Sequence, residues 1–307
     1  MEKNNILLTA GSSYLDVDAY ACMVAMAELL CLRGQSAAAY SKAPCNYSVT
    51  ESLSSASPII RELPEQVKLE ASYIIVDVSD PDFLKDSVPL ERVTEVYDHH
   101  VGFEEYWQRR IGDGAHIEFI GAAATLIYRE WKREGLTAKM SNSTARLLMA
   151  AILDNTLDFT SGNTTAEDEE TYRELCAIAG VGEEFRGEYF SEVQLRVEAD
   201  LRRAILNDTK RIGDNEVLPP RVAQLSVWNA QGILERLPEI RRWLAGDEEF
   251  LINLIDIRHR CSYFVCDCGI CQENIQRVFD VRFDSGVARS PIPYLRKEII
   301  KKTISKN

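Results

Sequence analysis

The stretch VTEVYDHHVGFEEY, from Val93 to Tyr106, sets an aspartate and two histidines directly behind a run of strand-forming residues. The whole chain has four histidines in 307 residues, so two of them side by side need a reason. One interpretation is a charged surface loop. The other is one corner of a metal site, and that interpretation requires matching ligands elsewhere in the chain.

The residues around this stretch predict a parallel sheet. Apolar runs at 4–10, 36–40, 72–80 and 92–100 alternate with helical patterns at 18–34, 122–135 and 142–156. Such alternation is typical of parallel strands joined by helices that cover both faces of the sheet. We therefore expect an α/β protein whose N-terminal part is a doubly wound, mainly parallel sheet.

The second half of the chain predicts a smaller α/β domain. Strand patterns occur at 221–228, 248–258 and 261–269, with a helical pattern at 230–246. The polar segment 180–196 is interpreted as the domain connection or a linking helix. We predict two domains, 1–188 and 189–307.

Composition limits the function. With 46% hydrophobic and 27% charged residues, the chain is an ordinary globular protein. Its formal net charge of -13 repels nucleic acid, so no duplex is expected as a partner. No apolar run approaches the roughly 20 residues that span a bilayer, so no membrane is expected either. The N-terminus has no secretory pattern and the eight cysteines are expected to be reduced, which predicts a cytoplasmic protein.

Acidic and imidazole side chains recur where predicted strands or helices end: Asp16, Asp18, Asp77, Asp98, His99, His100 and Asp154. Either of the first two could simply cap the helix that follows. Ligands of open α/β sheets, however, bind at the carboxyl ends of the strands. Carboxylate and imidazole ligands suit Mn²⁺, Co²⁺ or Mg²⁺, and a pair of such ions about 3.5–4 Å apart can clamp a phosphoryl group. The sequence therefore predicts a site for two divalent cations.

The motifs SSYLDVDA, IIVDVSD, YDHH and AAILDNTLDFTSGNTT occur in this order along the chain. With them the chain resembles the DHH phosphoesterase superfamily, in the branch of the family II inorganic pyrophosphatases and the exopolyphosphatase and prune-like proteins. The likeness continues through LNDTK, RVAQLSVWNAQGILERLPEI and SGVARSPIPYL, so the second domain is similar to a DHHA2 domain. Each motif alone is weak, whereas the ordered set is specific.

The resemblance implies a ligand for each of two ions, with Mn²⁺ the expected metal. Asp16 would bind one ion and Asp18 the other. Asp77 would bridge both, and His99 with Asp154 would complete the second site. The implied activity is hydrolysis of phosphoanhydride bonds in short-chain polyphosphate or pyrophosphate by metal-activated hydroxide.

The resemblance also implies roles in handling the substrate. Asp98 would orient its histidine neighbour, and His100 would face the phosphate and protonate the leaving group. In the second domain, Lys210 and Arg289 match the positions of phosphate-binding cations. A homodimer is a further expectation at the level of the family.

Three departures from the pyrophosphatase pattern favour polyphosphate slightly over pyrophosphate. Ser12 stands where those enzymes carry a metal-binding histidine. A second lysine is missing from VLPPRVAQL, and the basic pair near the C-terminus is reduced to Arg289 and Ser290.

Two other functions stay open. One is a phosphodiesterase acting on short oligonucleotides or cyclic dinucleotides, although its glycine-rich GGGH-type motif is missing from the sequence. The other is a degenerate binding protein without catalysis, for which Ser12 is the best argument.

The cysteine-rich stretch CSYFVCDCGICQEN holds Cys261, Cys266, Cys268 and Cys271. Only Cys268 and Cys271 have the C-x₂-C spacing of a zinc ligand pair. The alternation also suits a strand that uses cysteine as a small apolar residue.

Overall fold

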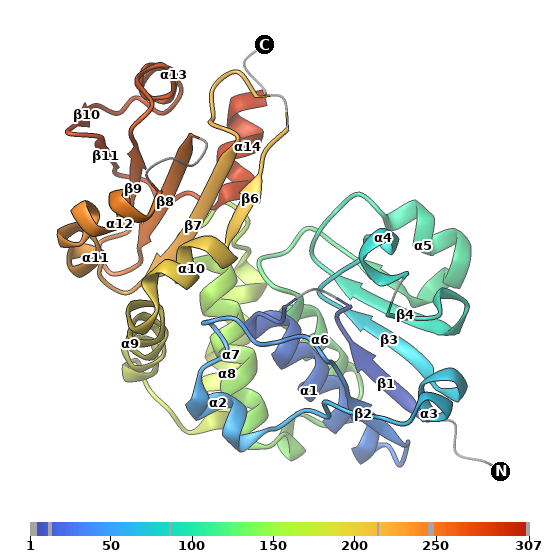
Figure 1. Cartoon of the computed structure of the whole chain (residues 1–307). Helices are drawn as coiled ribbons and strands as arrows, with labels where there is room; N and C mark the ends of the chain where they lie inside the picture. Colours follow the sequence, from blue (N-terminus) through green and yellow to red (C-terminus); the bar gives the residue numbers. More distant parts are fainter. Residues whose placement is uncertain (1–4, 12–13, 86, 214, 245–248, 305–307) are drawn as a thin grey trace. The chain divides into compact units, whose positions relative to one another are not determined.

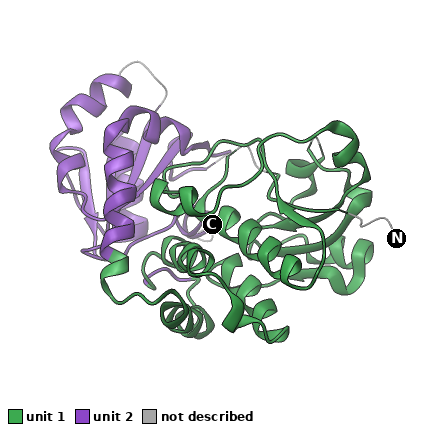
Figure 2. Ribbon diagram, turned by 90° about the horizontal axis from the view of Figure 1, so that it is seen from below, with its two compact units in different colours: residues 1–159, 163–186 green, residues 160–162, 187–307 purple. Residues whose placement is uncertain are grey.

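The computed structural model describes residues 5–11, 14–85, 87–213, 215–244 and 249–304 (Figure 1). It divides into two compact units, residues 1–159 with 163–186 and residues 160–162 with 187–307 (Figure 2). Helix α9 (Glu184–Ala199) contains the division, where a linking helix was one of the expectations. The exact boundary at 188/189 stays a prediction. None of the described helices is long and apolar enough to cross a bilayer.

The first unit contains a five-stranded, all-parallel sheet in the order β2-β1-β3-β4-β5. Its strands are β1 (Ile6–Thr9), β2 (Ala37–Ala39), β3 (Ser72–Val76), β4 (Val93–Asp98) and β5 (Ala115–Ile117). The first four confirm the predicted strands. The fifth was not predicted, because three half-buried residues give no apolar run or alternation to detect.

Helices cover both faces of this sheet (Figure 1). The helices of this unit are α1 (Val17–Leu32), α2 (Glu51–Ala56), α3 (Glu65–Glu70), α4 (Pro81–Leu84), α5 (Glu104–Ile111), α6 (Ala123–Arg133), α7 (Asn142–Thr156) and α8 (Ala166–Ala179), with short 3₁₀ turns at Leu90–Arg92, Gly112–Gly114 and Thr137–Lys139. On one face, Trp107 of α5 and Leu84 of α4 pack against Leu7 and Ile75 of the sheet. On the other, α1 is buried almost all round because it contacts β1, β3, α6 and α7. The doubly wound architecture is therefore confirmed.

The second unit contains a six-stranded mixed sheet in the order β10-β11-β9-β8-β7-β6, in which only β7 and β8 are parallel. Its strands are β6 (Thr209–Arg211), β7 (Arg221–Val227), β8 (Phe250–Asp256), β9 (Cys261–Cys266), β10 (Phe283–Asp284) and β11 (Val287–Ser290). Its helices are α10 (Leu201–Asn207), α11 (Gln231–Glu235), α12 (Leu237–Leu244), α13 (Gly269–Phe279) and α14 (Arg296–Ile304). This confirms the predicted second α/β unit.

One detail of the second unit differs from the predictions. The helix expected over 230–246 is two helices that break at Arg236, two residues before Pro238, which fits only the first turn of a helix because it has no N–H. The C-terminal helix α14 is anchored to the unit, since Ile299 is fully buried in the same core as Phe264 and Phe279.

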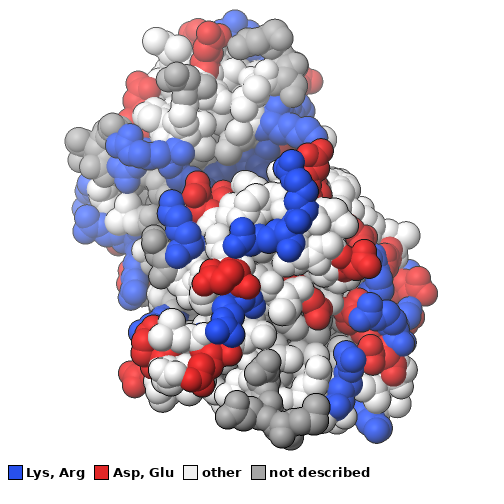
Figure 3. Space-filling view, turned by 90° about the vertical axis from the view of Figure 1, so that its right-hand side faces the viewer, with Lys and Arg blue, Asp and Glu red and all other residues white. Residues whose placement is uncertain are grey.

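On one face of the molecule, acidic side chains are mixed with basic ones (Figure 3). On the face drawn in Figure 3, acidic and basic side chains are interspersed with uncharged ones. Such mixing is typical of a soluble domain surface.

A buried carboxylate ties two helices of the first unit together. Asp168, fully buried in the first turn of α8, accepts hydrogen bonds from Gly121 N at 3.0 Å, Thr125 Oγ1 at 2.6 Å and Thr165 N at 2.8 Å. It also completes a capping box with Thr165. Gly121 has to be glycine, because a Cβ there would overlap Asp168 Oδ2.

Replacing Asp168 by alanine is expected to lower the free energy of unfolding by roughly 2–5 kcal/mol, because the buried donors of Gly121 and Thr125 and the partly buried donors of Thr165 lose their acceptor. The exposed Glu170 of the same helix is the matched control. Glu170→Ala is expected to change the free energy of unfolding by no more than about 0.5 kcal/mol. Urea denaturation measures both. A loss below about 1 kcal/mol for Asp168→Ala would mean that the donors find other partners.

Candidate metal centre

The candidate site lies at the carboxyl edge of the parallel sheet. Asp16 follows β1, Asp77 follows β3, and Asp98 ends β4 directly before His99 and His100. The strand order reverses direction at β1, with β2 on one side and β3 on the other, and this is where open α/β sheets bind ligands. The topology therefore brings the predicted residues to one edge.

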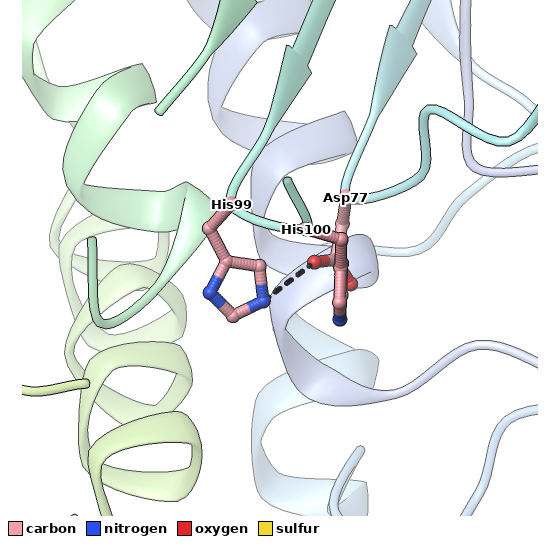
Figure 4. A group of neighbouring side chains, drawn as sticks. All are labelled: Asp77, His99 and His100. Atoms are coloured by element: carbon pink, nitrogen blue, oxygen red, sulfur yellow. Dashed lines mark ion pairs between the residues drawn. The ribbon is translucent and has the colours of Figure 1, made fainter. Parts of the chain in front are cut away.

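Three of the predicted residues form a compact group (Figure 4). Asp77, His99 and His100 each offer one ligand atom, and these atoms all lie within 4.8 Å of one another. Asp77 and His99 are almost completely buried, with side chains 6% and 1% exposed, whereas the ring of His100 is 55% exposed. The group is thus buried at Asp77 and His99 and open to solvent at His100.

The two buried members present acceptors to each other. Nδ1 of His99 lies 3.2 Å from the carbonyl oxygen of Ile120, which can only accept, so Nδ1 carries the proton. In the neutral ring, Nε2 then has a lone pair, and it lies 3.4 Å from Oδ1 of Asp77. A nitrogen lone pair and a carboxylate oxygen at this distance require a proton or a cation between them. A backbone carbonyl that fixes the tautomer in this way is characteristic of metal-binding histidines.

Asp77 is held in an unusual backbone conformation. Its φ is +58°, in the left-handed region, and its N–H donates to Tyr97 O at 2.7 Å. Its Oδ1 is buried and accepts no hydrogen bond within the part of the chain that the structure describes. Strain and an unsatisfied buried oxygen together mark a position selected for a ligand rather than for stability.

The two aspartates after β1 differ in their contacts. Asp16 caps α1, with Oδ1 accepting from Ala19 N at 2.9 Å, as the capping interpretation expected for one of the pair. Asp18 is fully buried and instead accepts from the first turn of α6, at 2.9 Å from Ala123 N and 2.8 Å from Ala124 N. Oδ1 of Asp18 also accepts from Cys22 Sγ at 3.4 Å, so the lone pairs left for a metal ion are on Oδ2 of Asp18 and on Asp16.

Crowding of carboxylates shifts their pKa values upward. Burial, together with the charge of Asp16, raises the pKa of Asp18 to about 7. Burial and the charges of Asp16, Asp18 and Asp98 raise the pKa of Asp77 well above its usual range. Buried anions that repel one another are stabilised by a cation placed among them.

Asp98 has a different environment. Burial by itself would raise its pKa, but hydrogen bonds from His100 outweigh this and lower the pKa. Oδ1 of Asp98 accepts from His100 N at 3.0 Å and lies 2.8 Å from His100 Nδ1. This pair fixes the His100 ring and leaves its Nε2 directed away from Asp98.

The structure does not bring every predicted residue into the group. Asp154 lies half-buried in the last turn of α7, before three consecutive residues with positive φ at 157–159. Lys210 in β6 and Arg289 in β11 belong to the second unit. Ser12 lies outside the described residues. The roles given to these residues stay predictions.

The structure adds backbone groups that the sequence did not reveal. Ile120 O orients His99, and the amides of Ala123 and Ala124 hold Asp18. Backbone donors and acceptors occur at every residue, so no sequence pattern distinguishes these three.

No protein-family model matches the chain. Two relatives named "Probable manganese-dependent inorganic pyrophosphatase" align along nearly all of it. The protein from Exiguobacterium sp. is 27% identical over 310 residues, which cover 96% of each chain. The protein from Staphylococcus carnosus is 27% identical over 295 residues and 93% of each chain. The chain is thus similar, over nearly its whole length, to proteins named as manganese-dependent inorganic pyrophosphatases. This relationship confirms the predicted resemblance.

Solved structures agree with this pyrophosphatase relationship in fold. A Methanococcus jannaschii protein assigned to the family II inorganic pyrophosphatases superposes with a TM-score of 0.68 at 18% identity, over 97% of both chains. An exopolyphosphatase-related protein from Bacteroides fragilis gives a TM-score of 0.55 at 13% identity, over 99% of this chain and 91% of the other. Both likenesses bear on the fold alone, and they support the predicted two-part α/β architecture.

Asp77→Asn is expected to stabilise the metal-free protein and to abolish its stabilisation by Mn²⁺. A carboxyl whose pKa is raised by folding costs stability as pH rises above its unfolded value of about 4. The stability that Asp77→Asn gains over wild type in the absence of metal should therefore increase from pH 4 upward. Asparagine also tolerates a positive φ, so the backbone is not strained further.

Thermal melts with and without Mn²⁺ measure both effects. Wild type should gain about 2.7 kcal/mol at an ion concentration one hundred times its Kd, and Asp77→Asn should gain far less. The exposed Asp82 supplies the control, since Asp82→Asn should behave like wild type. An unchanged Mn²⁺ response in Asp77→Asn would remove Asp77 from the site.

Proposed function

We propose that this protein is a divalent-metal-dependent phosphohydrolase that cleaves the phosphoanhydride bond of pyrophosphate or short-chain polyphosphate. The observation that carries the proposal is the group Asp77, His99 and His100, in which the facing acceptors of Asp77 and His99 require a proton or a cation between them. Relatives named manganese-dependent inorganic pyrophosphatases, aligned over almost the whole chain, give the reaction class.

The residues present fit a pair of hard divalent cations, with Mn²⁺ preferred. Asp77 and His99 would hold them together with Asp16, Asp18 and Asp154. Bound there, the ions would polarise phosphoryl oxygens and lower the pKa of coordinated water. The donor set of carboxylate oxygen and imidazole nitrogen suits Mn²⁺, Co²⁺ or Mg²⁺ and lacks the thiolates that softer metals select.

His100 and Asp98 would manage the proton of the leaving phosphate. Asp98 would accept from Nδ1–H of His100 and orient the ring, so that Nε2 faces a leaving-group oxygen to which it would donate. The half-exposed ring gives that nitrogen access to a substrate. A buried carboxylate behind an open imidazole is the arrangement that a general acid requires.

Binding of the phosphate chain would fall to Lys210 and Arg289 in the second unit. A guanidinium can bind a phosphate through two parallel hydrogen bonds, whereas an ammonium acts as a point charge. The names of the relatives favour pyrophosphate as the substrate, whereas Ser12 favours polyphosphate.

The proposal includes a small anionic substrate, not a nucleic acid duplex, and a cytoplasmic setting. The net charge of -13 supports the first part, because it repels a polyanion that no local metal neutralises. The eight cysteines are all free thiols, which suits a reducing compartment.

The test is phosphate release from pyrophosphate, tripolyphosphate, longer polyphosphate and a dinucleotide, each with Mn²⁺, Co²⁺ and Mg²⁺. We expect Mn²⁺-dependent turnover of pyrophosphate or tripolyphosphate. Asp77→Ala should abolish it with every metal, and Asp82→Ala should leave it unchanged. Turnover of the dinucleotide alone would establish a phosphodiesterase, and metal binding without any turnover would establish a binding protein.

His100→Gln separates proton transfer from metal binding. Loss of a general acid costs roughly 10²–10⁴ in kcat. We expect a fall in that range and loss of the basic limb of the pH–rate profile, while Mn²⁺ still raises the melting temperature. If the Mn²⁺ response disappears as well, His100 is a metal ligand and not the acid.

A further inference from the structure

A second group of ligand atoms lies in the other unit. Glu249, Cys268 and Cys271 each offer one atom, and these atoms all lie within 4.8 Å of one another. Glu249 directly precedes β8, Cys268 is the N-cap of α13, and Cys271 lies in the first turn of that helix. The group therefore joins the start of a central strand to the start of a helix.

The separations fit a tetrahedral ion. Sγ of Cys271 lies 3.8 Å from Oε2 of Glu249. Zn–S bonds of about 2.3 Å and Zn–O bonds of about 2.1 Å place two tetrahedral ligand atoms about 3.6 Å apart. Sγ of Cys268 accepts from Cys271 N at 3.3 Å, and this contact holds the sulfur at the N-terminus of α13, on the side of Cys271.

Cys266 is a third cysteine beside this group. It ends β9, is 1% exposed, and its Sγ lies 4.0 Å from Cys268 O. Burial, with the charges of Cys268, Asp267 and Glu249, raises the pKa of Cys266 to about 11. Burial, with a hydrogen bond to Cys268 and the charges of Cys266, Cys268 and Glu249, also raises the pKa of Cys271. A cation among these groups would relieve that repulsion as the thiols lose their protons.

We propose that Cys268, Cys271 and Glu249 form a second metal site, selective for a thiophilic cation such as Zn²⁺. Binding exchanges two thiol protons for one divalent ion, and the fourth tetrahedral position is filled by water or by Cys266 after a shift of its side chain. The ion would tie the start of β8 to the start of α13.

The packing interpretation explains only part of this group. Cys266 and Cys271 are buried and could serve as small apolar residues. Cys268 is half-buried and packs against the core that contains them, whereas Glu249 is exposed and has no apolar role. An apolar role gives no reason for a carboxylate oxygen to lie against two sulfurs, whereas a cation site does.

Co²⁺ titration of the full-length protein under reducing conditions tests the proposal. Sulfur ligands give Co²⁺ intense thiolate-to-metal charge-transfer absorption, which the oxygen and nitrogen ligands around Asp77 cannot produce. We expect this absorption to saturate at one equivalent of sulfur-bound Co²⁺ and to disappear when Zn²⁺ is added. Competition by Zn²⁺ follows from its higher place in the affinity order.

The informative variant is Cys268→Ser, because serine is itself a good N-cap and keeps α13 intact. It should lose most of the absorption, and Glu249→Gln should weaken Co²⁺ binding at least tenfold while keeping the charge-transfer bands. Cys176→Ser, at a half-buried thiol of the first unit, is the matched control and should keep the wild-type spectrum. No charge-transfer bands in reduced wild type, or equal bands in Cys268→Ser, would overturn the proposal.

Discussion

Mutual repulsion among buried carboxylates is the constraint on which the first unit depends. Asp18, Asp77 and Asp98 are removed from water at one edge of a parallel sheet, and Asp16 lies beside them. Each ionised group raises the cost of ionising the next. The fold tolerates this because amides of α6 and the ring of His100 neutralise part of the charge. The negative charge that these groups do not compensate is concentrated at Asp77. A divalent cation would therefore have its largest stabilising effect there.

The geometry follows from strand order and from one strained residue. Placing β1 between β2 and β3 creates a crevice at the reversal, and the loops after β1, β3 and β4 all open there. Asp77 turns back toward His99 only because its φ is positive. A position that combines conformational strain with a buried charge is unfavourable for stability, which is the common pattern at functional sites.

Sequence patterns predicted the parts of this arrangement that repeat or cluster. Apolar runs followed by acidic residues identified β1, β3 and β4, and the adjacent histidines identified the edge of the sheet. Three features lacked such a signal. The short β5 has no run of apolar residues, and the carbonyl of Ile120 looks like any other. The strand expected over 261–269 ends at Cys266, so the turn that brings Cys268 toward Glu249 was hidden by a continuing alternation.

The segment from Ile120 to Ala124 connects two buried acids that are far apart in the sequence. Its carbonyl at residue 120 orients His99, Gly121 N donates to Asp168, and the next amides donate to Asp18. One short piece of backbone thus shares its hydrogen-bonding groups between the ligand crevice and the α8 cap. Binding of a metal ion at this edge of the sheet would therefore also affect the first turn of α6. The exchange of amide protons with solvent should become slower there as the site is occupied. Amide exchange at the first turn of α6 would thus report whether the site is occupied, even when no substrate is present.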